Sequence, residues 1–232
     1  MTGGKTSSGL KQRVISGLIL APLVVGIIIA GGWFFGAMIL AAAFISLYEF
    51  LKLVDGTKNK WFHIIIGTVY LGLCFGSYVL IRTGYEQGAW LALVTILCVW
   101  ASDTGAYFVG KKVGGPKMAP RLSPNKTWAG LGGSMVFCGI SLVLLHYAAI
   151  PLQSVLNTNL GLDSSNTPCI FVIGVLLGLV GQAGDLMKSF YKRRAGVKDS
   201  GHLIPGHGGL LDRIDSLLLV SVAFLIILQV CL

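Results

Sequence analysis

The stretch KQRVISGLILAPLVVGIIIAGG, residues 11–32, decides the fold class of this protein. Its apolar part is long enough to cross a bilayer, for which an α-helix needs roughly 20 residues. It is also longer than the roughly 7–15 apolar residues of a typical secretory signal, and more apolar runs follow it. We therefore expect this stretch to be the first of several membrane-spanning helices.

The composition of the whole chain agrees with this interpretation. The mean hydropathy is +0.79, and only 12% of the residues are charged. Apolar runs predict seven spanning helices, at roughly 14–32, 33–54, 62–82, 88–110, 129–150, 168–188 and 210–231. The predicted fold is therefore all-α, a polytopic integral membrane protein with a single transmembrane domain over residues 1–232.

The distribution of basic residues predicts the orientation. With a cytoplasmic N-terminus, the seven spans place all 18 lysine and arginine residues except Arg82 on the cytoplasmic side, as the positive-inside rule requires. The net charge of +9 then indicates a basic face next to anionic lipid head groups and no nucleic-acid surface. The five cysteines show no CxxC spacing, which favours apolar packing over a disulfide or metal role.

Two predicted cytoplasmic loops, 102–128 and 188–209, hold most of the polar residues. Asp103 lies toward the cytoplasmic end of the fourth span, where a carboxylate near hydrocarbon indicates either a function or a partner at the interface. The segment SPNKTWAGLGG, residues 123–133, leads directly into a helix whose N–H groups can bind a phosphate. The alternative is a Ser-Pro turn followed by a helix N-cap, and this loop alone leaves both open.

The second loop is flanked by acids. Asp185 and Ser189 are four residues apart on one helix face, and Asp212 and Asp215 are three apart on the first turn of the last helix. The basic residues between them are Lys192, Arg193, Arg194 and Lys198. Carboxylates of this kind suit Mg²⁺, and the cations suit phosphate. Ion pairs with Asp212 at a helix N-terminus are the alternative, but the whole set at one membrane face favours a metal and phosphate site.

The run SFYKRRAGVKDSGHLIPGHGGLLDRID, residues 189–215, closely resembles the signature of the phosphatidate cytidylyltransferase family. Weaker resemblances occur in the family's order: LKQRVISGLIL, SDTGAYFVGKKVGG with LSPNKTWAG, and GDLMKS. Two residues depart from the pattern: Ala129 stands where members usually have Glu, and Tyr191 where an aliphatic residue or Phe is expected. The chain is also shorter than many members, which have eight or nine spans.

The resemblance implies the reaction of CTP with phosphatidic acid to give CDP-diacylglycerol and pyrophosphate. It implies Mg²⁺ as cofactor, with room for a second, monovalent cation. The implied partners are CTP, phosphatidic acid, membrane lipids and a second copy of the chain in a homodimer, with no nucleic acid. The expected location is the bacterial inner membrane, with the active site facing the cytoplasm.

The resemblance also assigns roles to individual residues. The expected catalytic residues are Asp185, Asp212, Lys192, Arg193 and His207. The expected metal ligands are Asp185, Asp212 and Asp215. The expected substrate contacts are Ser123, Lys126, Thr127, Ser189, Lys198, Gly208, Gly209 and Arg213, with Asp103 and Asp199 in support.

Three other classes of function remain open. A CTP-dependent lipid kinase would transfer the γ-phosphate instead of the cytidylyl group. A cation-coupled transporter would keep its charges near mid-membrane at broken helices, whereas here nearly all lie at the predicted cytoplasmic ends. A catalytically weak homologue is the third class, because Ala129 replaces the expected Glu. A CDP-alcohol phosphotransferase is disfavoured, since the DGxxAR-type motif is absent.

Overall fold

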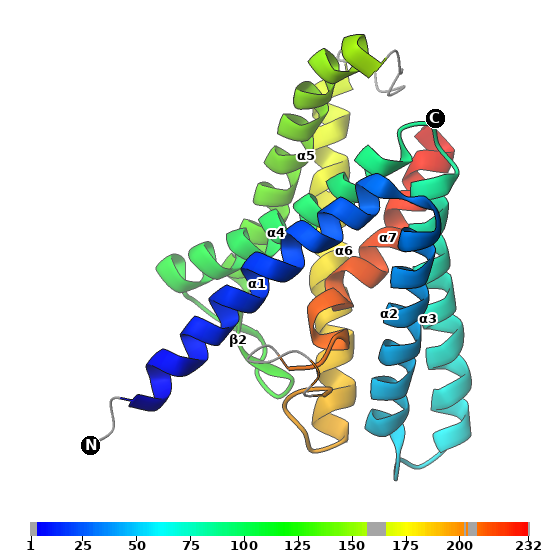
Figure 1. Ribbon diagram of the computed structural model, residues 1–232. Coiled ribbons are helices and arrows are strands. Elements are labelled where there is room, and N and C mark those ends of the chain that lie inside the picture. Colours follow the sequence, from blue (N-terminus) through cyan, green and yellow to red (C-terminus); the bar gives the residue numbers. More distant parts are fainter. Residues whose placement is uncertain (1–3, 157–165, 202, 204–207, 232) are drawn as a thin grey trace. The chain divides into compact units, whose positions relative to one another are not determined.

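The computed structural model describes residues 4–156, 166–201, 203 and 208–231, with residues 4–14, 150–156 and 231 described by their backbone only. These residues form seven helices and two short strands (Figure 1). In chain order they are α1 (Gly4–Ala30), α2 (Gly32–Val54), α3 (Lys60–Thr83), α4 (Gly88–Val113), β1 (Lys117–Ala119), β2 (Ser123–Thr127), α5 (Trp128–Leu156), α6 (Thr167–Arg194) and α7 (Leu211–Cys231).

The helices confirm the predicted all-α membrane class. Six of them, α2 to α7, are long and apolar enough to cross a membrane, and α1 carries a shorter apolar segment, Ile15–Ala30. Only 22% of the 18-residue apolar stretch of α2 is buried within the chain. Large apolar side chains such as Trp33 and Phe34 are exposed, as expected of surfaces that face lipid.

Two predicted boundaries were wrong, because helices extend into the segments expected to be loops. Helix α4 continues to Val113 instead of ending at residue 110, and Asp103 lies inside it as predicted. Helix α6 continues to Arg194, so Lys192 and Arg193, which were expected in the loop, are helical, and Ser189 lies on this helix as predicted. The remaining connections are 114–127 and 195–210, and both are shorter than predicted.

A β-hairpin follows α4 in place of the expected turn. Strands β1 and β2 are antiparallel, with Lys117 opposite Thr127 and Ala119 opposite Ser123 and an irregular register between these pairs. The sequence did not predict strands here because Pro116, Pro120 and Pro124 interrupt the segment, and proline cannot donate a ladder hydrogen bond.

The chain divides into two compact units. Unit 1 comprises residues 1–72 and 191–214, and unit 2 comprises residues 73–190 and 215–232. In unit 1, α3 contacts α2 closely at Gly67, where a Cβ atom would lie 2.0 Å from the ring of Phe50. The ring of Tyr191 packs edge-on against Phe50, with centroids 5.3 Å apart, and against His63. An aromatic residue at position 191 therefore fills space between α2 and α3.

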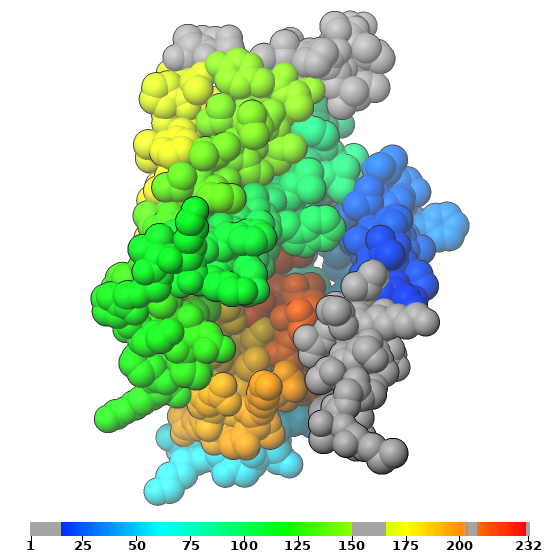
Figure 2. Space-filling view, turned by 90° about the vertical axis from the view of Figure 1, so that its left-hand side faces the viewer, coloured from blue at the N-terminus to red at the C-terminus, as the bar shows by residue number. Residues whose placement is uncertain are grey.

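Unit 2 is built around close packing of α4, α5 and α6. A Cβ atom on Gly105 would lie 2.5 Å from the Gly133 carbonyl oxygen, so only glycine allows α4 and α5 to approach this closely. The hydroxyls of Ser102 and Ser134 are hydrogen-bonded at 2.6 Å, and the Ser134 hydroxyl also reaches the Gly178 carbonyl of α6 at 3.2 Å. Figure 2 shows α4, the hairpin and α5, in green to yellow-green, as one continuous surface.

Candidate active site

Unit 2 brings residues of the two predicted site segments together. The ammonium group of Lys126, at the end of β2, lies 2.7 Å from Asp185 Oδ2 on α6 and 3.5 Å from the Gln182 carbonyl oxygen. A pocket of about 210 Å³ is lined by both residues and by Asp103, Asn125 and Thr127. Unit 2 therefore brings Asp103, Lys126, Thr127 and Asp185 to one pocket, and their predicted roles in the reaction stay predictions.

A second acid and base pair lies beside the first. Asp215 on α7 forms an ion pair with Lys188 on α6, and both side chains are largely buried. The carboxyl groups of Asp185 and Asp215 also interact with each other. Two neighbouring carboxylates therefore depend on two lysines for neutralisation, because a like-charged buried pair is costly alone.

This carboxylate pair suits a magnesium ion. Mg²⁺ is held in many sites by one or two carboxylates together with substrate phosphates, and Asp185 with Asp215 provides two. No group of three His, Cys, Asp or Glu side chains that could hold a metal occurs among the described residues. Asp212 lies in unit 1, so its predicted sharing of a metal ion with Asp185 stays a prediction.

The helix that follows Lys126 begins with an N-cap. The Thr127 hydroxyl accepts a hydrogen bond from the Gly130 N–H at 3.0 Å, and Thr127 is buried. This is the capping arrangement that the sequence left open as an alternative. Ala129 is the second residue of α5. The predicted nucleotide contacts of Ser123 and Thr127 stay predictions.

Unit 1 holds Asp212 in a network of hydrogen bonds. Its Oδ1 atom accepts a hydrogen bond from Lys192 Nζ at 2.8 Å. Its Oδ2 atom accepts from the Ser200 N–H at 2.8 Å and the Gly209 N–H at 3.3 Å, and it lies 3.1 Å from the Ser200 hydroxyl. The side chain is only 5% exposed. Asp212 therefore fixes both ends of the segment between α6 and α7.

Sequence reasoning missed a second acid in the same network, Glu49 of α2. This residue is 4% exposed, and its Oε1 atom accepts a hydrogen bond from the Leu210 N–H at 2.9 Å. Its Oε2 atom accepts from the Leu211 N–H at 2.9 Å and from the Ser200 hydroxyl at 2.8 Å. A carboxylate from α2 thus satisfies two N–H groups at the start of α7, where the helix dipole also favours negative charge.

Glycines allow the chain to wrap around the Glu49 carboxylate. A Cβ atom on Gly209 would lie 2.2 Å from the Ser200 hydroxyl oxygen and 2.6 Å from Glu49 Oε2. One on Gly201 would lie 2.6 Å from Glu49 Oε1. The close backbone approach at Gly209 is thus to Glu49 and Ser200, and the predicted contact of Gly209 with substrate stays a prediction. Gly208 has a φ of 89°, which favours glycine.

The remaining predicted site residues differ in burial and in position. Ser189 is buried on α6, whereas Arg193 and Lys198 are exposed. Arg213 is also exposed, on the first turn of α7, and Asp199 lines a pocket near Glu49. His207 lies outside the described residues. The signal that could have revealed Glu49 is its place in an apolar span, where an acid is costly without partners.

Asp55 lies directly after α2, outside the membrane-spanning segment. The Lys60 ammonium donates a hydrogen bond to its carboxylate at 2.7 Å. This hydrogen bond and the positive charge of Lys60 hold the pKa of Asp55 below its usual range. Asp55 is therefore already paired with a cation of its own.

Comparison with known proteins identifies the family of this chain. The cytidylyltransferase family model matches residues 11–79 and 55–231, and the chain belongs to that family. A phosphatidate cytidylyltransferase of Rickettsia conorii is 33% identical over 226 residues, which is 94% of this chain and 90% of the relative. That of Rickettsia bellii is 34% identical over 218 residues, with 94% and 90% covered. That of Bacillus subtilis is 36% identical over 158 residues, which is 68% of this chain and 54% of the relative.

Family membership defines the chemical class of the chain. It is a membrane-embedded nucleotidyltransferase. The paired acids and lysines of unit 2 are side chains of the kind that such chemistry on phosphates uses.

Proposed function

We propose that this protein transfers the cytidylyl group of CTP to phosphatidic acid, producing CDP-diacylglycerol and pyrophosphate. The observation that carries the proposal is the unit 2 cluster, in which Lys126 meets Asp185 beside the buried Asp215–Lys188 pair. Relatives that cover most of this chain bear the name of the same activity. The cluster supplies both charges that nucleotidyl transfer uses: carboxylates for a metal ion and ammonium groups for phosphates.

The reaction is an in-line displacement at phosphorus. A phosphate oxygen of phosphatidic acid forms a bond to the α-phosphorus of CTP. The bond between that phosphorus and the oxygen bridging to the β-phosphorus breaks, and pyrophosphate leaves with the bonding electron pair. Both reactants are anionic, so the protein contributes alignment and neutralisation of charge and needs no covalent nucleophile.

The side chains of unit 2 divide this work. Asp185 and Asp215 would hold Mg²⁺, which when bound neutralises charge on the phosphates. Lys126 lines the 210 Å³ pocket and would contact a phosphate oxygen of CTP. Lys188 would hold the Asp215 carboxyl group in place through their ion pair. Asp212 as a further ligand, a monovalent cation and a homodimer stay predictions.

The location of the reaction follows from its substrates. Phosphatidic acid has its phosphate at the membrane surface, and CTP is a water-soluble nucleotide of the cytoplasm. The positive-inside distribution of Lys and Arg supports a cytoplasmic N-terminus. Both site segments would then face the cytoplasm at the bacterial inner membrane.

The test follows where the α-phosphate and the γ-phosphate of CTP go in the reaction. Purified protein in detergent is given phosphatidic acid and Mg²⁺ with CTP labelled with ³²P at either the α or the γ position. The proposal predicts that the α-label enters the lipid and the γ-label leaves as pyrophosphate. Entry of the γ-label into the lipid would instead identify a lipid kinase. Absence of both labels from the lipid, in a sample with an intact thermal unfolding transition, would overturn the proposed reaction.

A further inference from the structure

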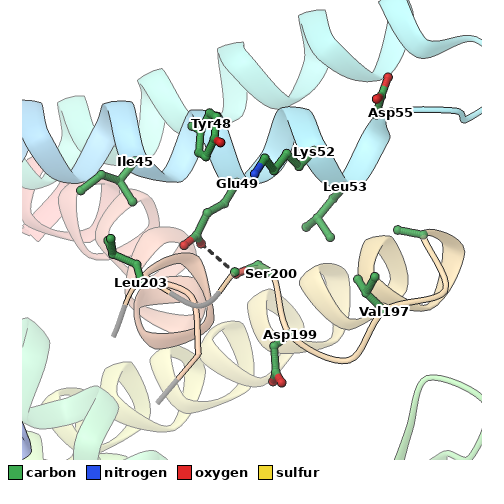
Figure 3. Close-up of a pocket in the computed structure, with 12 residues that line it drawn as sticks. Ile45, Tyr48, Glu49, Lys52, Leu53, Asp55, Val197, Asp199, Ser200 and Leu203 are labelled. Atoms are coloured by element: carbon green, nitrogen blue, oxygen red, sulfur yellow. Dashed lines mark hydrogen bonds between the residues drawn. The ribbon is translucent and has the colours of Figure 1, made fainter. Parts of the chain in front are cut away.

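A pocket of about 540 Å³ lies in unit 1, beside Glu49 (Figure 3). One wall is formed by the last turns of α2. The other is formed by residues that follow α6: Ala195, Val197, Asp199, Ser200, Gly201 and Leu203. The pocket belongs to the same unit as Asp212 and Lys192. None of the residues assigned to substrate binding from the sequence lines it, and its contents are therefore an open question.

The lining of this pocket is amphipathic. Apolar side chains on both walls include Ile45, Leu53, Val197 and Leu203 (Figure 3). Polar groups come from Lys52, from the Ser200–Glu49 hydrogen bond and from the carboxylates of Asp55 and Asp199. A ligand that fills this pocket must therefore carry an apolar portion as well as a polar one, since apolar walls gain little from a fully hydrated ligand.

Lys52 is the one basic side chain among the described residues that line the pocket. The Glu49 carboxylate accepts three hydrogen bonds, and the Asp55 carboxylate forms an ion pair with Lys60. The side chain of Asp199 points away from α2 in Figure 3. The Lys52 ammonium lies over the Tyr48 ring, 4.4 Å from its centroid, and among the described residues Lys52 takes part in no ion pair. An anionic group is the complementary partner for this ammonium.

The position of Lys52 specifies which anion. It lies in the last turn of α2, a helix long and apolar enough to cross a membrane. A lysine at the end of a spanning helix extends its ammonium to the level of the lipid phosphates. A lipid with a phosphate head group therefore matches the Lys52 ammonium group, its position at the end of a spanning helix, and the apolar wall of the pocket.

We propose that this pocket binds phosphatidic acid, with Lys52 contacting the lipid phosphate and the apolar wall covering the glycerol and the first acyl carbons. This inference rests on the proposed function, which supplies the lipid substrate. A phosphate could also come from CTP, but the triphosphate brings no apolar surface to match Leu53, Val197 and Leu203. The lipid is therefore the occupant, and CTP is the competing source that the test distinguishes.

The first experiment measures kinetics. Lys52→Gln removes the cation and Val197→Trp fills the apolar side, at a position that is 40% exposed and tolerates a large side chain. Each variant should raise the KM for dioctanoyl phosphatidic acid by about fivefold to tenfold and leave the KM for CTP unchanged. Lys58→Gln, an exposed lysine outside the pocket lining, is the matched control. An increase confined to the KM for CTP, or unchanged constants in both variants, would overturn the proposal.

The second experiment separates this inference from the reaction itself. Binding of radiolabelled dioctanoyl phosphatidic acid is measured on detergent-solubilised protein without CTP, with unlabelled inorganic phosphate or CTP as competitor. The expected result is saturable binding that weakens about fivefold to tenfold in Lys52→Gln, resists inorganic phosphate and persists even if no CDP-diacylglycerol is formed. Equal binding to wild type and Lys52→Gln, or full displacement by CTP, would overturn the pocket assignment whatever the outcome of the labelling assay.

Discussion

The two units of this protein neutralise their buried carboxylates by different means. In unit 2, Asp185 and Asp215 face the ammonium groups of Lys126 and Lys188. In unit 1, Glu49 and Asp212 accept hydrogen bonds mainly from backbone N–H groups and from Ser200, with Lys192 as the one ion-pair partner among the described residues.

This difference indicates different tasks. A lysine side chain can turn away when a metal ion or a phosphate arrives, because its stem is flexible. A backbone N–H group is fixed by the fold and cannot exchange its partner at low cost. The unit 2 carboxylates are therefore suited to bind and release ligands, whereas those of unit 1 hold the segment between α6 and α7 in one conformation.

The largest effect is expected from Asp185→Asn in unit 2. The amide binds a divalent ion poorly, so turnover should fall by about 10²–10³-fold. The Asp185 side chain is 32% exposed, and its ion pair adds little stability, so the free energy of unfolding should change by less than about 1 kcal/mol. Steady-state kinetics and unfolding in detergent measure both quantities. Turnover within threefold of wild type would remove Asp185 from the site.

Asp212→Asn in unit 1 should lower both activity and stability. An amide nitrogen in place of one oxygen faces donors that it cannot satisfy, and we expect a loss of about 2 kcal/mol in the free energy of unfolding. Turnover should fall by about 100-fold because Lys192 and the 199–209 segment lose their anchor, while the protein remains folded and inserted. Near-wild-type activity would contradict the predicted catalytic role of Asp212, and unchanged stability would contradict its anchoring role.

Glu49→Gln tests whether unit 1 needs a carboxylate or only a side chain of that size. Glutamine can accept the bond from one of the two backbone donors, so we expect a loss of about 2 kcal/mol in stability and about 10-fold in turnover. Hydrogen exchange should increase at residues 208–212 in particular. The matched control is Ser46→Ala on the same helix, which removes a buried hydroxyl that has no hydrogen-bond partner in the described part of the chain. This change should cost less than about 0.5 kcal/mol. Equal effects of both variants would reduce Glu49 to a packing residue.

The smallest effect concerns the N-cap of α5. Thr127→Ala should lower the free energy of unfolding by about 1 kcal/mol, because it removes the hydroxyl that accepts a hydrogen bond from the Gly130 N–H. Thr127→Ser keeps this hydroxyl and should therefore retain most of the wild-type stability. Chemical unfolding in detergent measures the difference between the two variants. If both variants are equally stable, the hydroxyl is not a stabilising cap.

Much of this arrangement could be predicted from the sequence. Apolar runs locate all seven helices that the structure describes, because length and hydropathy determine what can cross a bilayer, but α1, α5 and α6 extend beyond the predicted runs. From the sequence, Lys126 and Asp185 were expected on the same side of the membrane, whereas their ion pair was not predicted. Asp185, Asp212 and Asp215 were all expected as metal ligands, and the pairing of Asp215 with Lys188 was not predicted.

The contribution of Glu49 could not be predicted in the same way. Its partners are 151 to 162 residues away in the chain, and backbone N–H groups leave no mark in an amino-acid sequence. The hairpin of β1 and β2 was missed for a local reason, because its prolines are atypical of strands. Long-range contacts made through the backbone are thus what sequence patterns conceal.

The most direct test of this account is a Mg²⁺ titration of label transfer from α-³²P-CTP to phosphatidic acid, with wild-type protein and Asp185→Asn measured side by side. The account predicts that wild type forms labelled CDP-diacylglycerol only when Mg²⁺ is present. It also predicts that Asp185→Asn forms almost none at any Mg²⁺ concentration. Undiminished transfer by wild type in EDTA, or by Asp185→Asn in Mg²⁺, would contradict a metal site built on the carboxylates of unit 2.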